Sequence, residues 1–398
     1  MSATNPAHRR LFWNSHAFSL WAVCCATLGV GLIFGFQPPL MAFVLSRDGA
    51  SSAAIGAVTS IGTVAVLLLS PLYPRTITQL GTRNAMLVGV GVAIAILLVM
   101  PQWPDIRVWF ALRFVSGCGL GLAWIASEVW LNTLSTDESR SKVLGIYSTV
   151  FAAGVMAGPL LLQLIGTAGP WPFYIGAGCL ALTVVPLLAV RRSAAEIERK
   201  PKPERRLLQL LRDAPLAMLA ALSAGLVESA DISLLPVLGL RHGLDEQSSL
   251  YLVTVFLAGN VLLQLPIGVL ADRLGRSRAL AGCAVVGVIG PLLLIPAMSS
   301  QWLLWTLLFV WGGTLYGFYT QGIAMVGDSY PPEELAAANA AFVVVYCAGG
   351  IVGPSLGGAA MDLWVPNGLA VYLSCAPLLL LVAPLARFLT RRRTAGGP

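Results

Sequence analysis

Two carboxylates, Glu228 and Asp231, lie three residues apart in the stretch GLVESADISLLP, inside a long apolar segment. Residues three apart in a helix share a face, so both acids are predicted to point the same way. Two carboxyl groups this close and partly removed from water cannot both ionise cheaply. Such a pair is suited to binding a proton in one environment and releasing it in another. The alternative is a neutral, hydrogen-bonded pair with a structural role.

A third acid, Glu128, lies near one end of another apolar segment, with Trp124 one turn before it and Asn132 one turn after it. Charged groups are costly inside a bilayer and normally face a cavity or a partner. We expect Glu128 to face the same space as Glu228 and to contribute to proton binding. A fixed contact with the basic residues at 140–142 is the competing interpretation.

Arg113 is the only basic residue inside an apolar segment. Three roles are open to it: binding an anionic group, pairing with Asp231, or extending its long side chain to the interface. The other cavity candidates are aromatic or amide side chains, which together suit a small amphiphilic or polar organic molecule. They are Gln37, Trp124, Asn132, Asn260, Gln264, Tyr316, Tyr319 and Gln321. Helix packing or lipid contact is the alternative for each of them.

The composition identifies the elements that must position these side chains. Of the 398 residues, 57% are hydrophobic and 11% are charged, and the mean hydropathy is +0.79. Soluble domains carry about 25% charged residues, and a helix needs about 20 apolar residues to cross a bilayer. The sequence therefore predicts an all-α membrane protein. Its seven cysteines lie in apolar segments without metal-type spacing, and we expect no metal and no cofactor.

Twelve membrane spans are predicted. They run over 16–42, 52–73, 84–101, 106–132, 142–166, 170–190, 215–239, 249–271, 279–298, 302–327, 336–361 and 368–388. An even number places both termini on one side of the membrane. Of the 25 basic residues, only Arg47, Arg107 and Arg241 fall in loops on the opposite side. Basic loops stay in the cytoplasm, so we expect both termini to be cytoplasmic, with no role for the net charge of +7 in nucleic-acid binding.

One long polar connection divides the chain. The expected organisation is a six-helix bundle at 1–190, a cytoplasmic linker at 191–214 and a second six-helix bundle at 215–398. Within the linker, 205–212 is either a short amphipathic helix or plain solvated chain. The two halves repeat at an offset of about 195 residues (Gly117 and Gly312, Trp124 and Tyr319), as in secondary transporters built from two similar bundles.

Several motifs resemble the major facilitator superfamily. The stretch PIGVLADRLGRSRAL resembles its loop signature, with matching residues Gly268, Asp272, Arg273, Gly275, Arg276 and Arg278. The stretch RFVSGCGLG resembles its fourth-helix pattern, and WIASEVWLN is similar to the YcaD-like group of bacterial members. Two further stretches, GVMAGP and GGIVGP, resemble its glycine–proline motif at Gly154, Gly158, Pro159, Gly349, Gly353 and Pro354.

The resemblance implies conformational roles for these motifs. Glycines four apart let helices approach closely, and the following proline bends the helix, so we expect flexible contacts between the halves. The alternative is dense packing alone. The loop signature is expected to form a charged clasp that stabilises one conformation, or else only to set topology. Its first copy departs from the family, because Thr78 and Gln79 replace the usual Asp-Arg.

The resemblance also implies the activity: a monomeric secondary active transporter of the inner membrane, which moves a small organic solute by alternating access. Proton coupling is expected through Glu228, Asp231 and Glu128, and export is favoured over uptake of a polar metabolite. A sensor or lipid-handling relative of the same fold is the other alternative. An intramembrane enzyme is not indicated, because no HExxH stretch and no nucleophile–histidine arrangement is present.

Overall fold

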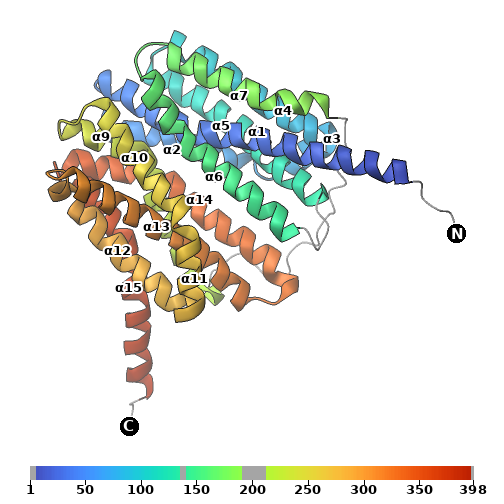
Figure 1. Ribbon diagram of the computed structural model, residues 1–398. Helices are drawn as coiled ribbons and strands as arrows, with labels where there is room; N and C mark the ends of the chain where they lie inside the picture. The colour runs from blue at the N-terminus through green and yellow to red at the C-terminus, as the bar shows by residue number, and fades with distance from the viewer. Residues whose placement is uncertain (1–5, 135–139, 191–211, 396–398) are drawn as a thin grey trace. The chain divides into compact units, whose positions relative to one another are not determined.

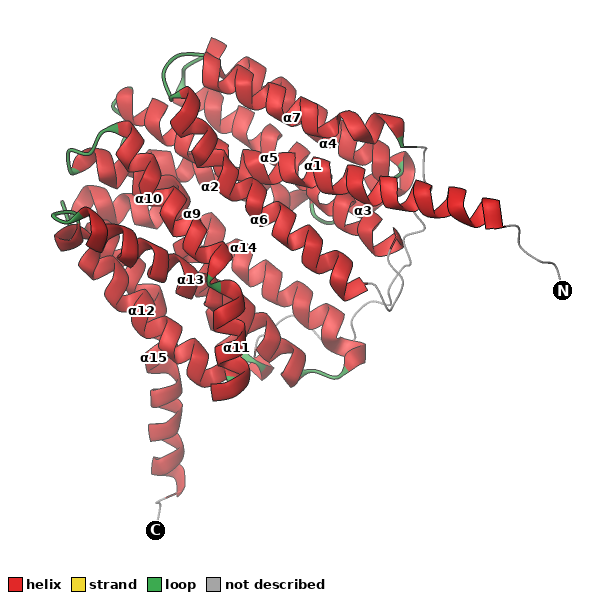
Figure 2. Cartoon of the chain, in the orientation of Figure 1, coloured by secondary structure: helices red, strands yellow, loops and turns green. Residues whose placement is uncertain are grey.

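The computed structural model describes residues 6–134, 140–190 and 212–395, and the regular elements in these ranges are helices (Figures 1 and 2). In the first half they are α1 (Pro6–Arg47), α2 (Ser52–Leu69), α3 (Tyr73–Leu80), α4 (Thr82–Val99), the short η1 (Met100–Gln102), α5 (Ile106–Leu134), α6 (Arg140–Ile165) and α7 (Trp171–Ala189). In the second half they are α9 (Pro215–Arg241), α10 (Glu246–Leu262), α11 (Gln264–Leu274), α12 (Arg276–Ala297), α13 (Gln301–Ser329), α14 (Pro332–Leu363) and α15 (Gly368–Ala395).

Eleven of the predicted spans each coincide with one of these helices, apart from short overhangs at span ends, and the eighth, 249–271, covers both α10 and α11. By length and hydropathy, the described residues contain nine helices able to cross a membrane, or ten when α10 and α11 count as one bent span. The other two predicted spans correspond to α13, which is 29 residues long, and to the apolar part of α15, Gly368–Val382. A helix satisfies its own backbone hydrogen bonds, which is why apolar segments adopt this form in lipid.

Large apolar side chains are exposed along these helices. Leu164, Leu265, Trp302 and Leu363 each expose at least 80% of their surface. Contiguous exposed apolar surface of this kind is rare on water-soluble proteins and marks contact with a membrane or a partner. Lipid is the natural neighbour of such helices.

The eighth predicted span is not one straight helix. It breaks at Leu263, and α10 and α11 meet at a bend of 45°. After α11 the chain turns at Gly275, whose φ of 88° favours glycine. Gly81 makes the matching turn between α3 and α4 with φ of 78°. The two halves of the sequence therefore repeat this turn at an offset of 194 residues.

The helices group into two compact units. One contains residues 1–40 and 64–199, and the other contains 41–63 and 200–398. The end of α1 and most of α2 therefore belong to the same unit as α9–α15.

In the first unit, α4 packs against both α5 and α7. The backbones of α4 and α5 touch, since a Cβ on Gly89 would lie 2.4 Å from the carbonyl oxygen of Gly119. Arg83, at the start of α4, donates hydrogen bonds of 2.7 and 2.8 Å to the carbonyls of Leu187 and Leu188 at the end of α7. These carbonyls have no hydrogen-bond donor within the helix, so Arg83 caps the C-terminal end of α7.

In the second unit, α9 and α14 form the most extensive helix pair. A buried apolar cluster joins α9, α13 and α14 around Ala221, Val326 and Phe342, with Tyr319 and Tyr346 packed against it. The neighbouring helices α10, α12 and α13 complete this core. The pair α9–α14 is the element that positions the acids of the candidate site.

Candidate functional site

Glu228 is held by a tyrosine from the neighbouring helix. The hydroxyl of Tyr346 on α14 donates a hydrogen bond of 2.9 Å to Oε2 of Glu228 on α9. The two helices can approach this closely because α9 has a glycine at the contact: a Cβ on Gly225 would lie 2.0 Å from the carbonyl oxygen of Tyr346. Gly225 is three residues before Glu228, so the same contact brings the carboxylate to the phenol. The Glu228 side chain stays partly exposed.

An aromatic cluster surrounds this hydrogen bond. The ring of Tyr319 on α13 lies 5.2 Å from that of Tyr346 and 5.3 Å from that of Phe342, both edge to face, and it stacks on Tyr316 at 5.9 Å. We call Tyr316, Tyr319 and Tyr346 the tyrosine cluster. All three tyrosines are partly exposed. Their π faces next to a carboxylate form the kind of surface that attracts an organic cation.

Asp231 lies in a drier position than its neighbour. It is 0% exposed, and neither carboxyl oxygen accepts a hydrogen bond from any residue that the structure describes. It is close enough to Glu228 to interact with it electrostatically, and also to Tyr372 on α15. The hydroxyl of Tyr372 is likewise buried without a hydrogen-bond partner in the described chain. The two acids therefore differ: Glu228 is partly accessible and hydrogen-bonded, and Asp231 is sealed.

Glu128 occupies a similar setting in the first unit. Its carboxylate accepts a hydrogen bond from Trp124 one turn earlier on α5. The ring of Trp124 stacks on Phe151 at 6.0 Å and meets Phe34 edge to face at 5.9 Å. Asn132 does not join this group, because it is exposed and donates to the carbonyl of Glu128 on its own helix. The side chains of residues 140–142, the competing partners of Glu128, lie outside the described residues.

The aromatic pairs of the two units follow the sequence repeat. Trp124 and Phe151 become Tyr319 and Tyr346 on adding 195 to each residue number. Each half of the sequence thus carries an aromatic pair on its fourth and fifth long helices (α5 and α6, α13 and α14), with a carboxylate beside it. The offset that relates Trp124 to Tyr319 also relates Phe151 to Tyr346, so the repeat in the sequence is the signal that identifies Tyr346.

Arg113 is buried and bonded inside the first unit. It is 6% exposed, and its Nη1 donates a hydrogen bond of 2.5 Å to Oε1 of Gln37 on α1. Gln37, which is 0% exposed, also donates through Nε2 to the sulfur of Met100 at 3.4 Å. The alternative in which Arg113 extends to the interface is therefore wrong. Its Nε has no hydrogen-bond partner among the described residues.

Three other cavity candidates differ in burial: Asn260 and Gln321 are buried, and Gln264 is exposed. Asn260 is 7% exposed near the end of α10, but Gln264 begins α11 beyond the bend and is exposed among the leucines Leu262 and Leu265. The predicted span 249–271 places both residues on one helix, and this is wrong because the helix breaks at Leu263. Gln321 is 4% exposed on α13.

The glycine–proline motifs contact helices of their own unit. A Cβ on Gly154 or Gly158 of α6 would lie 2.4 Å from the backbone of α1, at Leu28 and Phe36 respectively. In α14, a Cβ on Gly353 would lie 2.3 Å from the carbonyl oxygen of Leu226 on α9, and Gly349 makes a similar contact with Leu222. These four glycines therefore pack against helices of their own half of the sequence, whereas the carbonyl of Pro354 contacts Gly56 of α2, which belongs to the first half. Pro159 and Pro354 both lie inside continuous helices.

The loop signature forms an ion pair that does not include its aspartate. Arg276 Nη1 lies 2.7 Å from Oδ2 of Asp328 at the end of α13 and also donates to the carbonyl of Ala324. Asp272 and Arg273 are exposed at the end of α11, and Gly268 has open space around it. Asp272 makes no hydrogen bond or ion pair within the part of the chain that the structure describes, so the expected clasp through this residue is absent there. In the first copy, Thr78 bonds only the carbonyl of Pro74 on its own helix.

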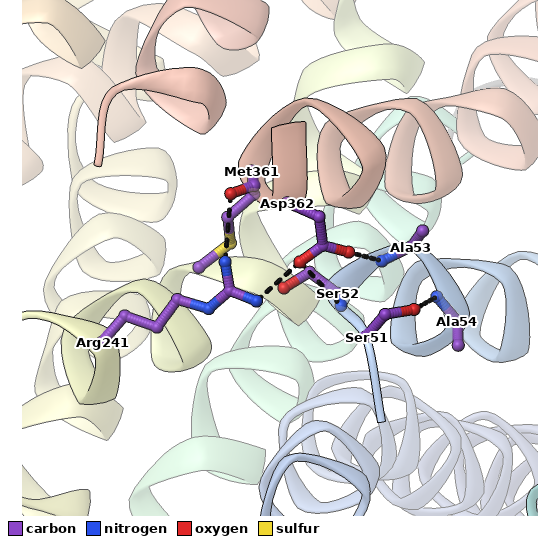
Figure 3. Close-up of polar contacts among 7 residues, drawn as sticks. All are labelled: Ser51, Ser52, Ala53, Ala54, Arg241, Met361 and Asp362. Carbon is purple, nitrogen blue, oxygen red and sulfur yellow. Dashed lines mark hydrogen bonds and ion pairs between the residues drawn. The ribbon is translucent and has the colours of Figure 1, made fainter. Parts of the chain in front are cut away.

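Some residues that matter here were not anticipated from the sequence. They are Tyr346, Phe151, Tyr372, Asp328, Arg241 and Asp362. The last two form an ion pair at the end of α9 and α14 (Figure 3). Asp362 was overlooked because it lies at the end of an apolar segment, where a polar residue is ordinary. Within the described ranges, no group of three or more His, Cys, Asp or Glu residues is arranged to hold a metal ion.

Long apolar helices, an internal repeat and acids beside aromatic rings define a polytopic membrane protein built like a secondary transporter. The chain belongs to the Major Facilitator Superfamily, whose sequence model matches residues 20–255 and 243–398. It is similar to the uncharacterised MFS-type transporter YfkF of Bacillus subtilis (strain 168), with 25% identity over 82% of this chain and 85% of YfkF. It is also similar to YcaD of Shigella flexneri, with 27% identity over 69% of this chain and 71% of YcaD.

Solved structures share the fold. The nucleoside transporter NupG superposes with a TM-score of 0.77 at 16% identity, covering 93% of this chain and 99% of NupG. A bacterial homologue of the human lysosomal transporter Spinster superposes with a TM-score of 0.72 at 14% identity, covering 95% of this chain and 97% of that protein. The family, its YcaD-like relatives and the twelve-span fold are as the sequence motifs predicted. The chain is thus a membrane transporter and not an enzyme.

Proposed function

We propose that this transporter couples solute movement to protons through Glu228 and Asp231, with Glu128 contributing, and that it exports a small cationic or amphiphilic organic molecule. The observation that carries the proposal is the setting of the acid pair. A partly exposed carboxylate, Glu228, touches the tyrosine cluster. One turn further along α9, Asp231 is fully buried, and no described residue donates a hydrogen bond to it.

The chemistry favours exchange of a proton for a cation. An ionised carboxyl group is costly to bury without a donor or a cation. A proton on Glu228 and a positive group on the neighbouring tyrosine rings neutralise the same charge, so binding of one disfavours binding of the other. This competition is the basis of antiport, in which each ligand leaves before the other binds. Alternating access of the two bundles then carries them in opposite directions.

The substrate class follows from the charges and rings at the site. Glu128, Glu228 and Asp231 lie away from the ends of the membrane-spanning helices and close to aromatic rings, whereas Arg113, which also lies away from the helix ends, is bonded to Gln37. A positive, partly aromatic molecule is therefore favoured over an anion. A thermal-shift screen with sugars, amino acids, organic acids and organic cations identifies the class, and we expect the largest shifts with the organic cations.

Proteoliposomes test the coupling. The purified protein is assayed for uptake of tetraphenylphosphonium against an imposed pH gradient, and separately for exchange of labelled for unlabelled compound at equal pH. Glu228→Gln should abolish gradient-driven accumulation, and comparison with Asp231→Asn identifies which acid carries the proton. Asp245→Asn, which removes an acid in a loop, serves as the matched control. Gradient-driven transport that is unchanged in both acid variants would refute proton coupling.

A second candidate is proton-coupled uptake of a polar or anionic metabolite. It is favoured by one observation: Arg113 is buried, and its Nε has no hydrogen-bond partner among the described residues. Thermal shifts confined to organic acids, and lost in Arg113→Met, would support this candidate over export of a cation. Failure of any compound to move in either assay would instead favour a sensor of the same fold.

We further propose that the protein lies in the cell's inner membrane as a monomer with both termini in the cytoplasm. The orientation is supported by the distribution of basic residues, of which only Arg47, Arg107 and Arg241 fall in loops of the opposite side. A C-terminal alkaline phosphatase fusion should be inactive and a C-terminal green fluorescent protein fusion fluorescent. The reverse result would contradict the orientation.

A further inference from the structure

We propose that Asp362 is the centre of a latch that holds the extracytoplasmic ends of the helices closed. The latch consists of Asp362 and its partners Arg241, Ser52 and Ala53, together with a second ion pair between Arg47 and Glu246 (Figure 3 shows the first set). All these residues belong to the compact unit of residues 41–63 and 200–398. The latch is independent of the acid pair proposed for proton coupling.

Asp362 caps a helix that is distant in sequence. Its Oδ2 accepts a hydrogen bond of 2.9 Å from the backbone amide of Ala53, and its Oδ1 accepts one of 3.2 Å from that of Ser52. These are the first two amides of α2. The next amide, that of Ala54, is capped at 3.2 Å by the hydroxyl of Ser51 (Figure 3). The first amides of a helix lack partners within it and carry a partial positive charge, so a carboxylate binds there favourably.

Arg241 ties the same carboxylate to α9. Its Nη2 donates a hydrogen bond of 2.6 Å to Oδ1 of Asp362, and its Nη1 donates one of 3.0 Å to the carbonyl of Met361 (Figure 3). The planar guanidinium thereby bonds a side chain and a terminal carbonyl of α14 together. One aspartate thus joins the ends of three helices: α2, α9 and α14.

A second ion pair lies between other ends of the same unit. Arg47, the last residue of α1, donates to Oε1 of Glu246, the first residue of α10. Two of the three arginines in loops on the predicted extracytoplasmic side are therefore engaged in these pairs. Basic residues are disfavoured on that side, and the pairs give Arg47 and Arg241 a specific role there.

Below the latch, α2 and α14 touch along their backbones. A Cβ on Gly358 would lie 2.1 Å from the carbonyl oxygen of Ser52, and one on Gly56 would lie 1.9 Å from that of Pro354. Further along, the hydroxyls of Ser60 and Ser355 are 3.4 Å apart. No side chain separates the two helices at these positions. In this proposal, opening this end of the protein separates α2 from α14 within the unit and breaks the bonds of Asp362.

Labelling of a buried cysteine tests the latch. Ser60, which is 5% exposed, is replaced by cysteine as the reporter. A membrane-impermeant maleimide is added to intact cells, and mass spectrometry follows the labelling of the peptide that contains residue 60. Adding Asp362→Asn should raise the labelling rate about tenfold. The loss of a charge-assisted hydrogen bond shifts the equilibrium between the closed and open states by about this factor, and the reporter is labelled in the open state. Asp245→Asn is the matched control. It removes an acid that bonds only its own helix, at the amide of Ser248, and should leave the rate unchanged.

Two further variants keep the result decisive. Arg241→Gln should raise the labelling rate less than Asp362→Asn, because Asp362 still accepts hydrogen bonds from the amides of Ser52 and Ala53. In the pair Ser60→Cys with Ser355→Cys, mild oxidation should form a disulfide in high yield, and Asp362→Asn should lower that yield. An Asp362→Asn rate equal to that of the Asp245→Asn control, or labelling only from the cytoplasmic side of inverted vesicles, would overturn the proposal. Because no substrate is needed, failure of the latch and failure of proton coupling are distinguishable.

Discussion

Tyr346 donates its hydroxyl to the carboxylate of Glu228 at 2.9 Å, across the contact between α14 and α9. The same ring lies 5.2 Å from Tyr319, so one side chain joins the proposed proton site to the aromatic surface proposed for substrate. The two roles of Tyr346 can be separated by substitution, since phenylalanine keeps the ring and removes the hydroxyl.

We expect Tyr346→Leu to weaken tetraphenylphosphonium binding by about 3- to 30-fold, the range that a cation–π contact of about 0.5–2 kcal/mol provides. Tyr346→Phe should bind within about threefold of the parent, because the ring contact with Tyr319 persists. Isothermal titration in detergent measures both. Tyr251→Leu, which disrupts an aromatic pair with Trp305 elsewhere, is the control. Equal losses in the phenylalanine and leucine variants would show that the ring does not bind the cation.

The close packing of α9 and α14 leads to a second prediction. A methyl group at position 353 would lie 2.3 Å from the carbonyl oxygen of Leu226, so the helices must separate to admit it. Gly353→Ala should therefore lower the melting temperature in detergent, by an amount equivalent to about 1–3 kcal/mol. Gly282→Ala, in a helix interior with nothing within 4 Å, should be neutral or slightly stabilising. The prediction fails if both variants melt alike.

The buried bond between Arg113 and Gln37 leads to a third prediction. Gln37→Leu leaves the guanidinium without this acceptor in a site that is 6% exposed, which should cost about 2–4 kcal/mol of stability. The double variant with Arg113→Met removes both polar groups and should recover most of the loss. Thermal unfolding of the four proteins forms a double-mutant cycle. Additive effects of the two substitutions would mean that the residues do not stabilise each other.

A fourth prediction concerns acid pH and the loop acid Asp245, which caps α10. Hydrogen bonds from Ser248 lower the pKa of Asp245 below its usual value, because they favour the ionised form. A carboxyl with a lowered folded-state pKa stabilises the protein above its ordinary pKa of about 3.9, and this stabilisation fades as pH falls through the lowered value. Asp245→Ala should thus lower the melting temperature at pH 7, with a difference that shrinks towards pH 3. A constant difference between the two pH values would contradict the assignment.

The helices and the family were predictable because their signals are local or recur in the sequence. A run of about 20 apolar residues is enough to predict a spanning helix, whatever packs against it. The glycine and charge motifs at Gly268–Arg278 and the repeat at an offset of 195 residues were likewise readable without coordinates. The acids Glu128, Glu228 and Asp231 were identified because charge is costly in an apolar segment.

The partners of those residues were not predictable, because a contact between helices depends on their rotation and depth. A rotation of one residue moves a side chain by about 100° around the helix. This is why three roles were open to Arg113, and none of them included its partner in the structure, Gln37. The break at Leu263 likewise separated Gln264 from Asn260, although their spacing suits a single helix face.

Sequence alone determined that this chain is a helical membrane transporter of the Major Facilitator Superfamily and which of its acids lie among apolar residues, because both follow from composition along the chain. Only the tertiary structure decided that Glu228 is bonded to Tyr346, that Asp231 is sealed, and that Asp362 caps α2 from 309 residues away. These relationships depend on which backbones can touch. That is set by glycines such as Gly225 and Gly358 on facing helices, whose contact surfaces form only when the chain is folded.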